Sequence, residues 1–231
     1  MAGASAEENQ RIYGDESRPH GHGYVLDVTV EGPALVRGGM LMNSTDLKEL
    51  IRRHVLIGLD GLNLNRDVAD LAGVPCTAEN LLAYCRARIS PRLASSLRLA
   101  RLDLKEDPVV SYRMAGEGTM VRVTITADFS AAHRLHSADL SASENLSLFG
   151  KCNNPSGHGH NYVVEATLEG IPDPRTGRAV DVERLKVLVQ ESADRFDHKH
   201  LNEDCAEFKN LNPTAENVCR VLFGLIAPGA A

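Results

Sequence analysis

The chain has 231 residues, enough for one large or two small domains, and a formal net charge of −6. Its 43% hydrophobic and 24% charged residues are typical of a globular protein. The negative balance argues against nucleic acid as the main partner, because a phosphate backbone attracts basic surfaces. No apolar run reaches the roughly 18 residues that a membrane helix needs, so we expect no membrane partner either.

The cysteines are scattered and odd in number, which argues against a disulfide framework or a cysteine-rich zinc finger: Cys76, Cys85, Cys152, Cys205 and Cys219. The first residues, MAGASAEENQ, have neither the basic start nor the apolar stretch of a secretory signal. We therefore expect a cytoplasmic protein with reduced thiols.

An internal repeat organises the chain. Four segments of the first half recur in the second half, in the same order and at nearly constant spacing. They are SAEENQRIYG (5–14) and SASENLSLFG (141–150), PHGHGYVLDVTVEG (19–32) and GHGHNYVVEATLEG (157–170), LDGLNLN (59–65) and FDHKHLN (196–202), and CTAENLL (76–82) and PTAENVC (213–219). We expect two copies of one unit, copy one over residues 1–115 and copy two over 120–231, joined near the Gly-rich MAGEGTM (114–120).

In copy one, apolar residues at helical spacing over 44–59 predict a helix with Ser44 and Thr45 as candidate caps. The run LRLARLDLKEDPVVSYRM (97–114) predicts two short strands around Asp107-Pro108. Copy one has no counterpart of the first strand of copy two, so it is expected to consist of a strand, helices and a hairpin.

In copy two, residues 121–135 and 162–170 alternate apolar and polar side chains, as half-buried strands do. Residues 180–196 have helical spacing, and Thr214 is placed to cap a second helix. Copy two ends before reaching a hairpin. Helices inserted between antiparallel strands predict an α+β fold for both partial copies.

His158-Gly159-His160 is the strongest local signal for chemistry. Residues i and i+2 of a strand project from the same face, so both imidazoles can reach one metal ion. His133, at the end of the preceding strand, is the natural third ligand. Three neutral imidazoles leave the fourth position of a tetrahedral zinc open, as in catalytic sites. An isolated His-x-His occurs by chance or in a turn about as often as in a metal site. Here the surrounding residues favour the metal site.

Two further segments carry candidate catalytic groups. Cys152 lies in a polar Gly-Lys-Cys-Asn-Asn loop, where Lys151 and a nearby cation would favour its thiolate and let it act as a general base. Asp197 precedes His198, and a carboxylate beside an imidazole can orient it and raise its basicity. The alternatives are a spare loop cysteine and an exposed pair at a helix end.

Copy one has the pattern of a depleted version of this site. It keeps Asp60 but has Gly61 at the position that corresponds to His198. Glu16 lies near the position that corresponds to Cys152. It retains His20 and His22 and has no counterpart of the first histidine ligand.

The motifs FSAAHRL, ENLSLFGKCNNPSGHGHNY, DHKHLN and PTAEN closely resemble the 6-pyruvoyltetrahydropterin synthase family over almost all of copy two, and copy one resembles it more distantly. The resemblance implies the tunnelling fold, in which an antiparallel sheet with two helices packed on one face assembles into barrels. It therefore implies a homo-oligomer that binds a small-molecule pterin.

The resemblance also implies roles for the residues of copy two. It implies Zn²⁺ held by His133, His158 and His160. It implies Cys152 as the residue that abstracts a proton, working with Asp197 and His198, which in the family come from an adjacent subunit.

The resemblance further implies a glutamate on a late strand that anchors the pterin ring. Because copy two ends before that strand, Glu106 in LDLKEDP of copy one is the candidate, with Thr214 and Glu216 as secondary pterin contacts. We hypothesise that the hairpin 97–113 packs beside the copy-two strands and supplies Glu106.

The substrate implied is 7,8-dihydroneopterin triphosphate, which would lose triphosphate and yield 6-pyruvoyltetrahydropterin. The first alternative is the related 6-carboxytetrahydropterin synthase of queuosine (7-deazaguanine) synthesis, whose usual motif has three residues between Cys and His-Gly-His where copy two has five. Glu16-x-x-x-His20-Gly21-His22 resembles a third variant that feeds folate synthesis. A non-catalytic pterin- or metal-binding paralogue also stays open. A zinc deaminase or hydrolase is disfavoured, because the Pro-Cys-x-x-Cys and His-x-Glu signatures of such deaminases are missing.

Overall fold

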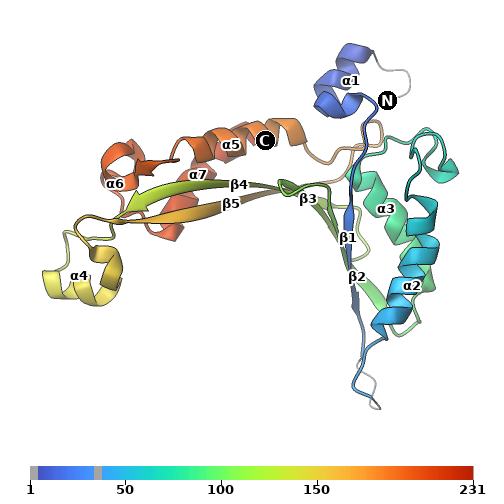
Figure 1. Cartoon of the computed structure of the whole chain (residues 1–231), viewed down its shortest axis with the longest axis horizontal. Helices are drawn as coiled ribbons and strands as arrows, with labels where there is room; N and C mark the ends of the chain where they lie inside the picture. The colour runs from blue at the N-terminus through green and yellow to red at the C-terminus, as the bar shows by residue number, and fades with distance from the viewer. Residues whose placement is uncertain (1–4, 34–37, 231) are drawn as a thin grey trace. The chain divides into compact units, whose positions relative to one another are not determined.

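The computed structural model describes residues 5–33 and 38–230 (Figure 1). The chain forms two compact units, the first from residues 1–124 and 167–183 and the second from 125–166 and 184–231. The segment 167–183, which follows the histidine strand of copy two in the sequence, therefore packs as part of the first unit. Among the described residues, no helix combines the length and the apolar character needed to cross a membrane.

Copy one provides a three-stranded antiparallel sheet and its helices. The order is α1 (Ala6–Tyr13), β1 (Val25–Glu31), α2 (Ser44–His54), α3 (Ala78–Ile89), β2 (Arg98–Lys105) and β3 (Val110–Ala115). Strand β2 pairs with both neighbours, with Val25 opposite Lys105 and Arg101 opposite Ala115. The two strands predicted around Asp107-Pro108 are thus confirmed as β2 and β3.

Copy two provides β4 (Val121–His133), α4 (Ala142–Phe149), β5 (His158–Gly170), α5 (Val182–Asp194), β6 (Lys199–His200), α6 (Leu201–Asp204) and α7 (Ala215–Ala230). Strand β4 lies next to β5 and also pairs in parallel with the short β6, with Ala131 opposite Lys199. Side chains along β4 alternate between buried and more exposed positions, as the sequence predicts. The antiparallel sheet with helices confirms the α+β class.

Short 3-10 helices lie between these helices and strands in the described part of the chain. They are η1 (Gly14–Ser17), η2 (Leu56–Gly58), η3 (Ala69–Leu71), η4 (Ser90–Arg92), η5 (Gly150–Asn153) and η6 (Ala206–Phe208).

The repeat is visible in the local structure of the two copies. Helices α1 and α4 each have 8 residues and begin at a serine cap, Ser5 in copy one and Ser141 in copy two. Each ends at a glycine with positive φ, 55° at Gly14 and 53° at Gly150, and each continues into a 3-10 helix. A residue without Cβ is required at such a backbone angle, which explains why the glycine stands at the same place in both copies.

Two details of the predicted helices differ in the structure. The helix predicted over 44–59 ends at His54, because Val55 is only 1% exposed and leaves the helical region with φ −123°. Its cap is Asn43, whose side chain accepts the backbone N–H of Thr45 at 2.9 Å, so the prediction of Ser44 or Thr45 as the cap was wrong. The cap predicted at Thr214 is confirmed, since its hydroxyl accepts the N–H of Asn217 at 3.4 Å.

An aromatic cluster forms the core beneath the histidine strands in the second unit. Phe129 on β4 stacks on Tyr162 of β5 with ring centroids 4.8 Å apart and planes inclined by 9°. Phe196 and Phe208 extend the cluster, and all three phenylalanines are at most 2% exposed. Burying a phenylalanine contributes about 1.5–3 kcal/mol, so these contacts hold the facing strand ends in place.

Candidate metal centre

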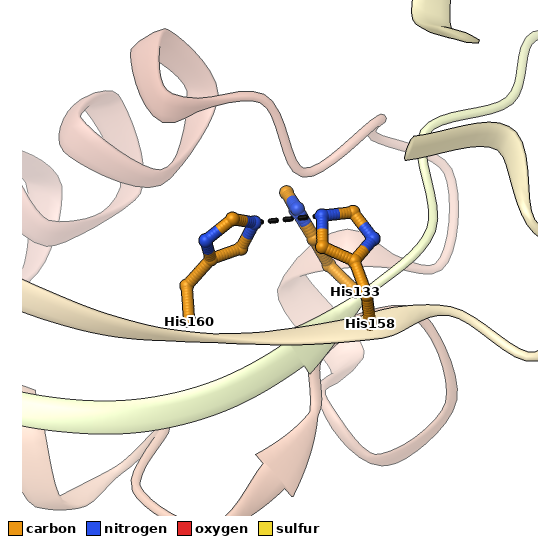
Figure 2. Close-up of side chains that lie close together, drawn as sticks. All are labelled: His133, His158 and His160. Atoms are coloured by element: carbon orange, nitrogen blue, oxygen red, sulfur yellow. Dashed lines mark hydrogen bonds between the residues drawn. The ribbon is translucent and has the colours of Figure 1, made fainter. Parts of the chain in front are cut away.

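Three histidines converge where β4 ends and β5 begins (Figure 2). The ring centroids of His133, His158 and His160 lie 4.5 to 5.0 Å apart, and one nitrogen from each ring falls within 4.8 Å of the others. The Nε2 atoms of His158 and His160 are 2.7 Å apart. The structure thus brings together the three residues that the sequence predicts as ligands, in a group that could hold a metal ion.

The orientation of His133 is set by a backbone carbonyl. Its Nδ1 lies 2.7 Å from the carbonyl oxygen of Pro213, which accepts a hydrogen bond if that nitrogen carries the proton. The lone pair then belongs to Nε2, which is buried and has no hydrogen-bond partner among the described residues. Such a carbonyl contact is the usual way in which proteins fix the tautomer of a metal-binding histidine.

The electrostatics of His133 favour the form that binds metals. Burial lowers the pKa of the ring, the carbonyl of Pro213 opposes this shift, and the neighbouring imidazoles of His158, His160 and His200 lower the pKa further. A neutral imidazole has a free lone pair, whereas a protonated one has none.

The Asp197–His198 pair is held against β4 by the backbone of Ser130. The carboxylate of Asp197 accepts a hydrogen bond from the backbone N–H of Ser130 at 2.8 Å and lies 2.6 Å from Nδ1 of His198. The backbone N–H of His198 in turn donates a hydrogen bond to the carbonyl oxygen of Ser130 at 2.6 Å. The N–H of Ser130 and the His198 side chain lower the pKa of the Asp197 carboxyl. The side chain of His198 is 83% exposed, and it lines the same hollow of about 500 Å³ as His160.

Cys152 lies in η5, just before the histidine strand. Its carbonyl accepts the N–H of Leu135 at 2.8 Å, which ties this loop to the chain beyond β4. Burial is the main cause that raises the pKa of the nearby strand residue Tyr162. No hydrogen bond joins Cys152 to the Asp197–His198 pair within the part of the chain that the structure describes.

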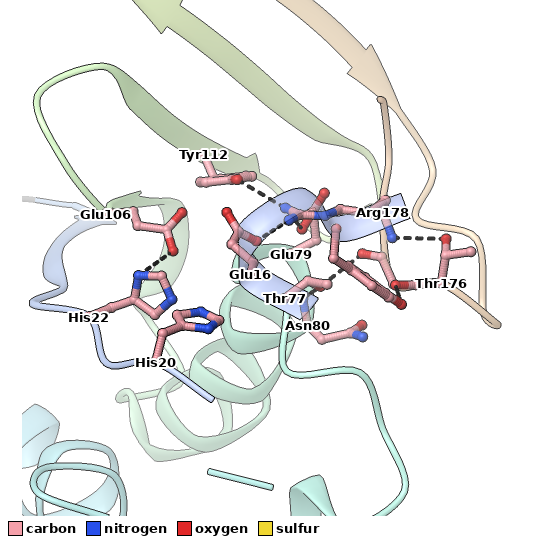
Figure 3. Close-up of polar contacts among 12 residues, drawn as sticks. Glu16, His20, His22, Thr77, Glu79, Asn80, Glu106, Tyr112, Thr176 and Arg178 are labelled. Atoms are coloured by element: carbon pink, nitrogen blue, oxygen red, sulfur yellow. Dashed lines mark hydrogen bonds and ion pairs between the residues drawn. The ribbon is translucent and has the colours of Figure 1, made fainter. Parts of the chain in front are cut away.

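The predicted pterin contacts occupy different places. Thr214 caps α7 with its hydroxyl, and Glu216 is exposed in the first turn of that helix. Glu106 belongs to the first unit, where its carboxylate lies 2.7 Å from His22 Nδ1 (Figure 3). The same carboxylate accepts a hydrogen bond from the hydroxyl of Tyr24 at 3.4 Å. That Glu106 serves the copy-two site stays a prediction.

The histidines of copy one are arranged differently from those of copy two. His20 and His22 precede β1 instead of lying on it, and the Nδ1 atom of His20 is 2.5 Å from the carbonyl of Arg18. Over residues 5–33 and 38–230, the three copy-two histidines are the only group of three side chains with ligand atoms close enough to share a metal.

Three residues beside the centre were missed by reasoning from the sequence. Tyr162 continues the i, i+2 series of the histidine strand, and its hydroxyl lies 3.4 Å from His133 Nδ1, so the alternation was a usable signal. The carbonyl of Pro213 had no side-chain signal. His200 packs against Gly157, where an added Cβ would lie 2.6 Å from the ring and 2.9 Å from the carbonyl oxygen of His133.

Comparison with known proteins identifies the family. The sequence model of the 6-pyruvoyl tetrahydropterin synthase family matches residues 2–117 and again residues 122–230. The chain belongs to this synthase family. The two matched segments fit two tandem copies, each of which resembles one family unit.

Individual members of the synthase family match about half of the chain. A putative 6-pyruvoyl tetrahydrobiopterin synthase of Caenorhabditis elegans is 48% identical over 105 residues, which cover 46% of this chain and 73% of the relative. The 6-pyruvoyl tetrahydrobiopterin synthase of Homo sapiens is 46% identical over 110 residues, 47% of this chain and 76% of the relative. A putative 6-carboxy-5,6,7,8-tetrahydropterin synthase of Archaeoglobus fulgidus is 34% identical over 105 residues, 46% of this chain and 75% of the relative.

Among solved structures, the 6-pyruvoyl tetrahydropterin synthase of Caenorhabditis elegans is similar over 48% of this chain and 80% of that chain, with 42% identity and a TM-score of 0.46.

Proposed function

We propose that the chain is a zinc-dependent lyase of the 6-pyruvoyltetrahydropterin synthase type, which acts on 7,8-dihydroneopterin triphosphate and releases triphosphate. The observation that carries the proposal is the convergence of three imidazoles, one of which has a buried Nε2 without a partner among the described residues. We further propose that it works as a cytoplasmic homo-oligomer.

The donor set fits zinc. Three imidazoles from two neighbouring strands, those of His133, His158 and His160, are the donor set that would hold a catalytic zinc ion. The carbonyl of Pro213 fixes one ligand ring in the orientation that presents Nε2. When bound, zinc supplies Lewis-acid polarisation of the substrate side-chain hydroxyls, which acidifies the adjacent C–H bond.

The chain's own groups would move the protons. Cys152, as thiolate, takes the proton from the activated carbon of the substrate side chain, and the electron pair left behind forms a C=C bond as the C–O bond to triphosphate breaks. The resulting enol needs further proton transfers to become the diketo product. His198, held by Asp197 at 2.6 Å and largely exposed, is suited to carry these protons.

The pterin ring needs a partner for the edge that carries its N3–H and 2-amino groups. A carboxylate can accept both donors at once. We propose Glu106 for this role, with Thr214 and Glu216 as secondary contacts. Glu106→Ala should weaken pterin binding while zinc content stays the same, and Glu117→Ala, an exposed glutamate of the following turn, serves as control. Unchanged pterin affinity in Glu106→Ala would show the assignment to be wrong.

Two alternatives remain, and each makes a distinct prediction. The 6-carboxytetrahydropterin synthase reaction uses the same substrate, and the five residues between Cys152 and His158 favour the pyruvoyl product over it. A non-catalytic pterin- or metal-binding protein would bind without releasing triphosphate.

The deciding experiment is product analysis of the zinc-loaded full chain with 7,8-dihydroneopterin triphosphate. Triphosphate release together with 6-pyruvoyltetrahydropterin supports the proposal. Release with the 6-carboxy product supports the first alternative. No release, from a protein that holds one zinc per chain, supports a binding function and overturns the proposed lyase.

A further inference from the structure

The first unit contains two glutamates, one buried and one partly exposed, that pair with a buried arginine of the same chain (Figure 3). The side chain of Arg178 is only 7% exposed. Its guanidinium donates to the hydroxyl oxygen of Tyr112 at 3.1 Å and forms an ion pair with Glu16. Its Nη1 atom lies 3.8 Å from Oε2 of Glu79.

Glu79 is the more deeply buried of these two glutamates. It is 0% exposed, and its Oε1 accepts the backbone N–H of Ala179 at 3.1 Å. Its Oε2 has no hydrogen-bond partner within the described part of the chain. Burial raises the pKa of this carboxyl, and Arg178 acts against that shift. A carboxylate removed from water in this way needs a cation close by.

The neighbouring backbone docks closely beside the start of α3. The hydroxyl of Thr77 donates to the carbonyl of Gly177 at 2.9 Å. Gly177 has φ +72°, and an added Cβ would lie 2.6 Å from the side chain of Asn80 and 2.9 Å from the hydroxyl of Thr77. Residues 176–179 therefore lie tightly against the start of α3, which leaves no room for a larger side chain at position 177. We call the space that Arg178 fills beside Glu16, Glu79 and Tyr112 the acidic recess.

The internal repeat relates this recess to a segment of copy two. Thr77 and Glu79 stand in Cys-Thr-Ala-Glu-Asn, at the positions that Thr214 and Glu216 occupy in Pro-Thr-Ala-Glu-Asn of copy two. In copy two the glutamate is exposed. In copy one the same two side chains bind the chain's own residues 177–179.

We propose that the acidic recess of copy one is a binding site for a small planar cation of the guanidinium or amidinium class, and that Arg178 occupies it from within the chain. Copy one is thereby closed to ligands from solution. The planar fork of an arginine can meet Glu16, Glu79 and Tyr112 from different sides at once, which a compact ammonium group cannot do. The competing interpretation is an ordinary buried ion pair that stabilises the fold without forming a ligand site.

Chemical rescue separates the two interpretations. Arg178→Ala in the full chain empties the recess and should lower the melting temperature. Methylguanidinium at millimolar concentration should raise it again with a saturating dose dependence, whereas methylammonium at equal concentration should not. The control is Arg175→Ala, three residues earlier, which removes an exposed arginine paired with Glu8 and should show no rescue.

A second variant tests the acidic partner. In Arg178→Ala with Glu79→Gln, the recess keeps its shape and loses its deepest charge, so methylguanidinium should no longer rescue. If Arg178→Ala does not fold, its refolding yield from urea, with and without methylguanidinium, replaces the melting temperature as the readout. Absence of saturable rescue in either measurement, or equal rescue in Arg175→Ala, would overturn the proposal and leave a structural ion pair.

Discussion

Gly157 precedes the histidine strand and provides the sharpest test of how the candidate metal centre is built. Its φ is +67°, and a Cβ at this position would lie 2.6 Å from Nε2 of His200 and 2.9 Å from the carbonyl oxygen of His133. The imidazole of His200 could rotate away. The carbonyl of His133 belongs to the backbone of a predicted ligand, so relief there must displace the strand end itself.

The expected magnitude of Gly157→Ala has two parts. A Cβ at positive φ costs roughly 1–2 kcal/mol. Overlap with packed neighbours adds about 1–3 kcal/mol. Gly116 has φ +63° and nothing within 4 Å of an added Cβ, so Gly116→Ala should show the first part alone. The difference between the two variants isolates the overlap beside the centre.

The assay pairs urea unfolding of both variants with zinc affinity measured by chelator competition. Gly157→Ala should lose about 2–5 kcal/mol of unfolding free energy, against about 1–2 kcal/mol for Gly116→Ala. Displacing the groups that orient a ligand typically weakens metal binding about 10–100-fold, so only Gly157→Ala should show that loss. Equal stability losses and equal zinc affinities in the two variants would refute the claim that this contact positions His133.

The other predictions concern the three groups assigned to the reaction. His133→Ala should not retain stoichiometric zinc after dialysis, because two imidazoles remain; metal analysis of the dialysed protein that still shows one zinc per chain would contradict the ligand assignment. Cys152→Ala should keep its zinc and lose about 10²–10⁴-fold in triphosphate release, the usual contribution of a general base, and undiminished release would remove the thiol from the mechanism. Asp197 has a lowered pKa in the folded state, so its stabilising effect is present above the ordinary pKa and disappears as the pH falls through the lowered one. In urea unfolding, the free energy of unfolding of Asp197→Asn should therefore depend less on pH under acidic conditions than that of the unsubstituted chain. An unchanged pH dependence would contradict the observed hydrogen bonds.

Much of the fold follows from local patterns that can be read in the chain. Alternation over 121–135 predicts β4. The first matched pair of repeat segments coincides with α1 and α4, for which no helix was predicted from the sequence. The His-x-His spacing predicts that two imidazoles share a face, because that spacing depends only on strand geometry. The end of α2 was misplaced, since the burial of Val55 in the core is a property of the fold and not of helical spacing.

The contacts that orient the site were decided only in three dimensions. The carbonyl of Pro213 reaches His133 across 80 residues, and Arg178 meets Glu16 across 162. Backbone carbonyls are chemically alike along the chain, so residue type does not predict which of them will face a buried imidazole. By itself the sequence determined the repeat, the strand faces and the ligand candidates, because these depend on short-range periodicity. Tertiary structure decided which polar groups are paired, because burial leaves each of them only the partners that folding brings within hydrogen-bond distance.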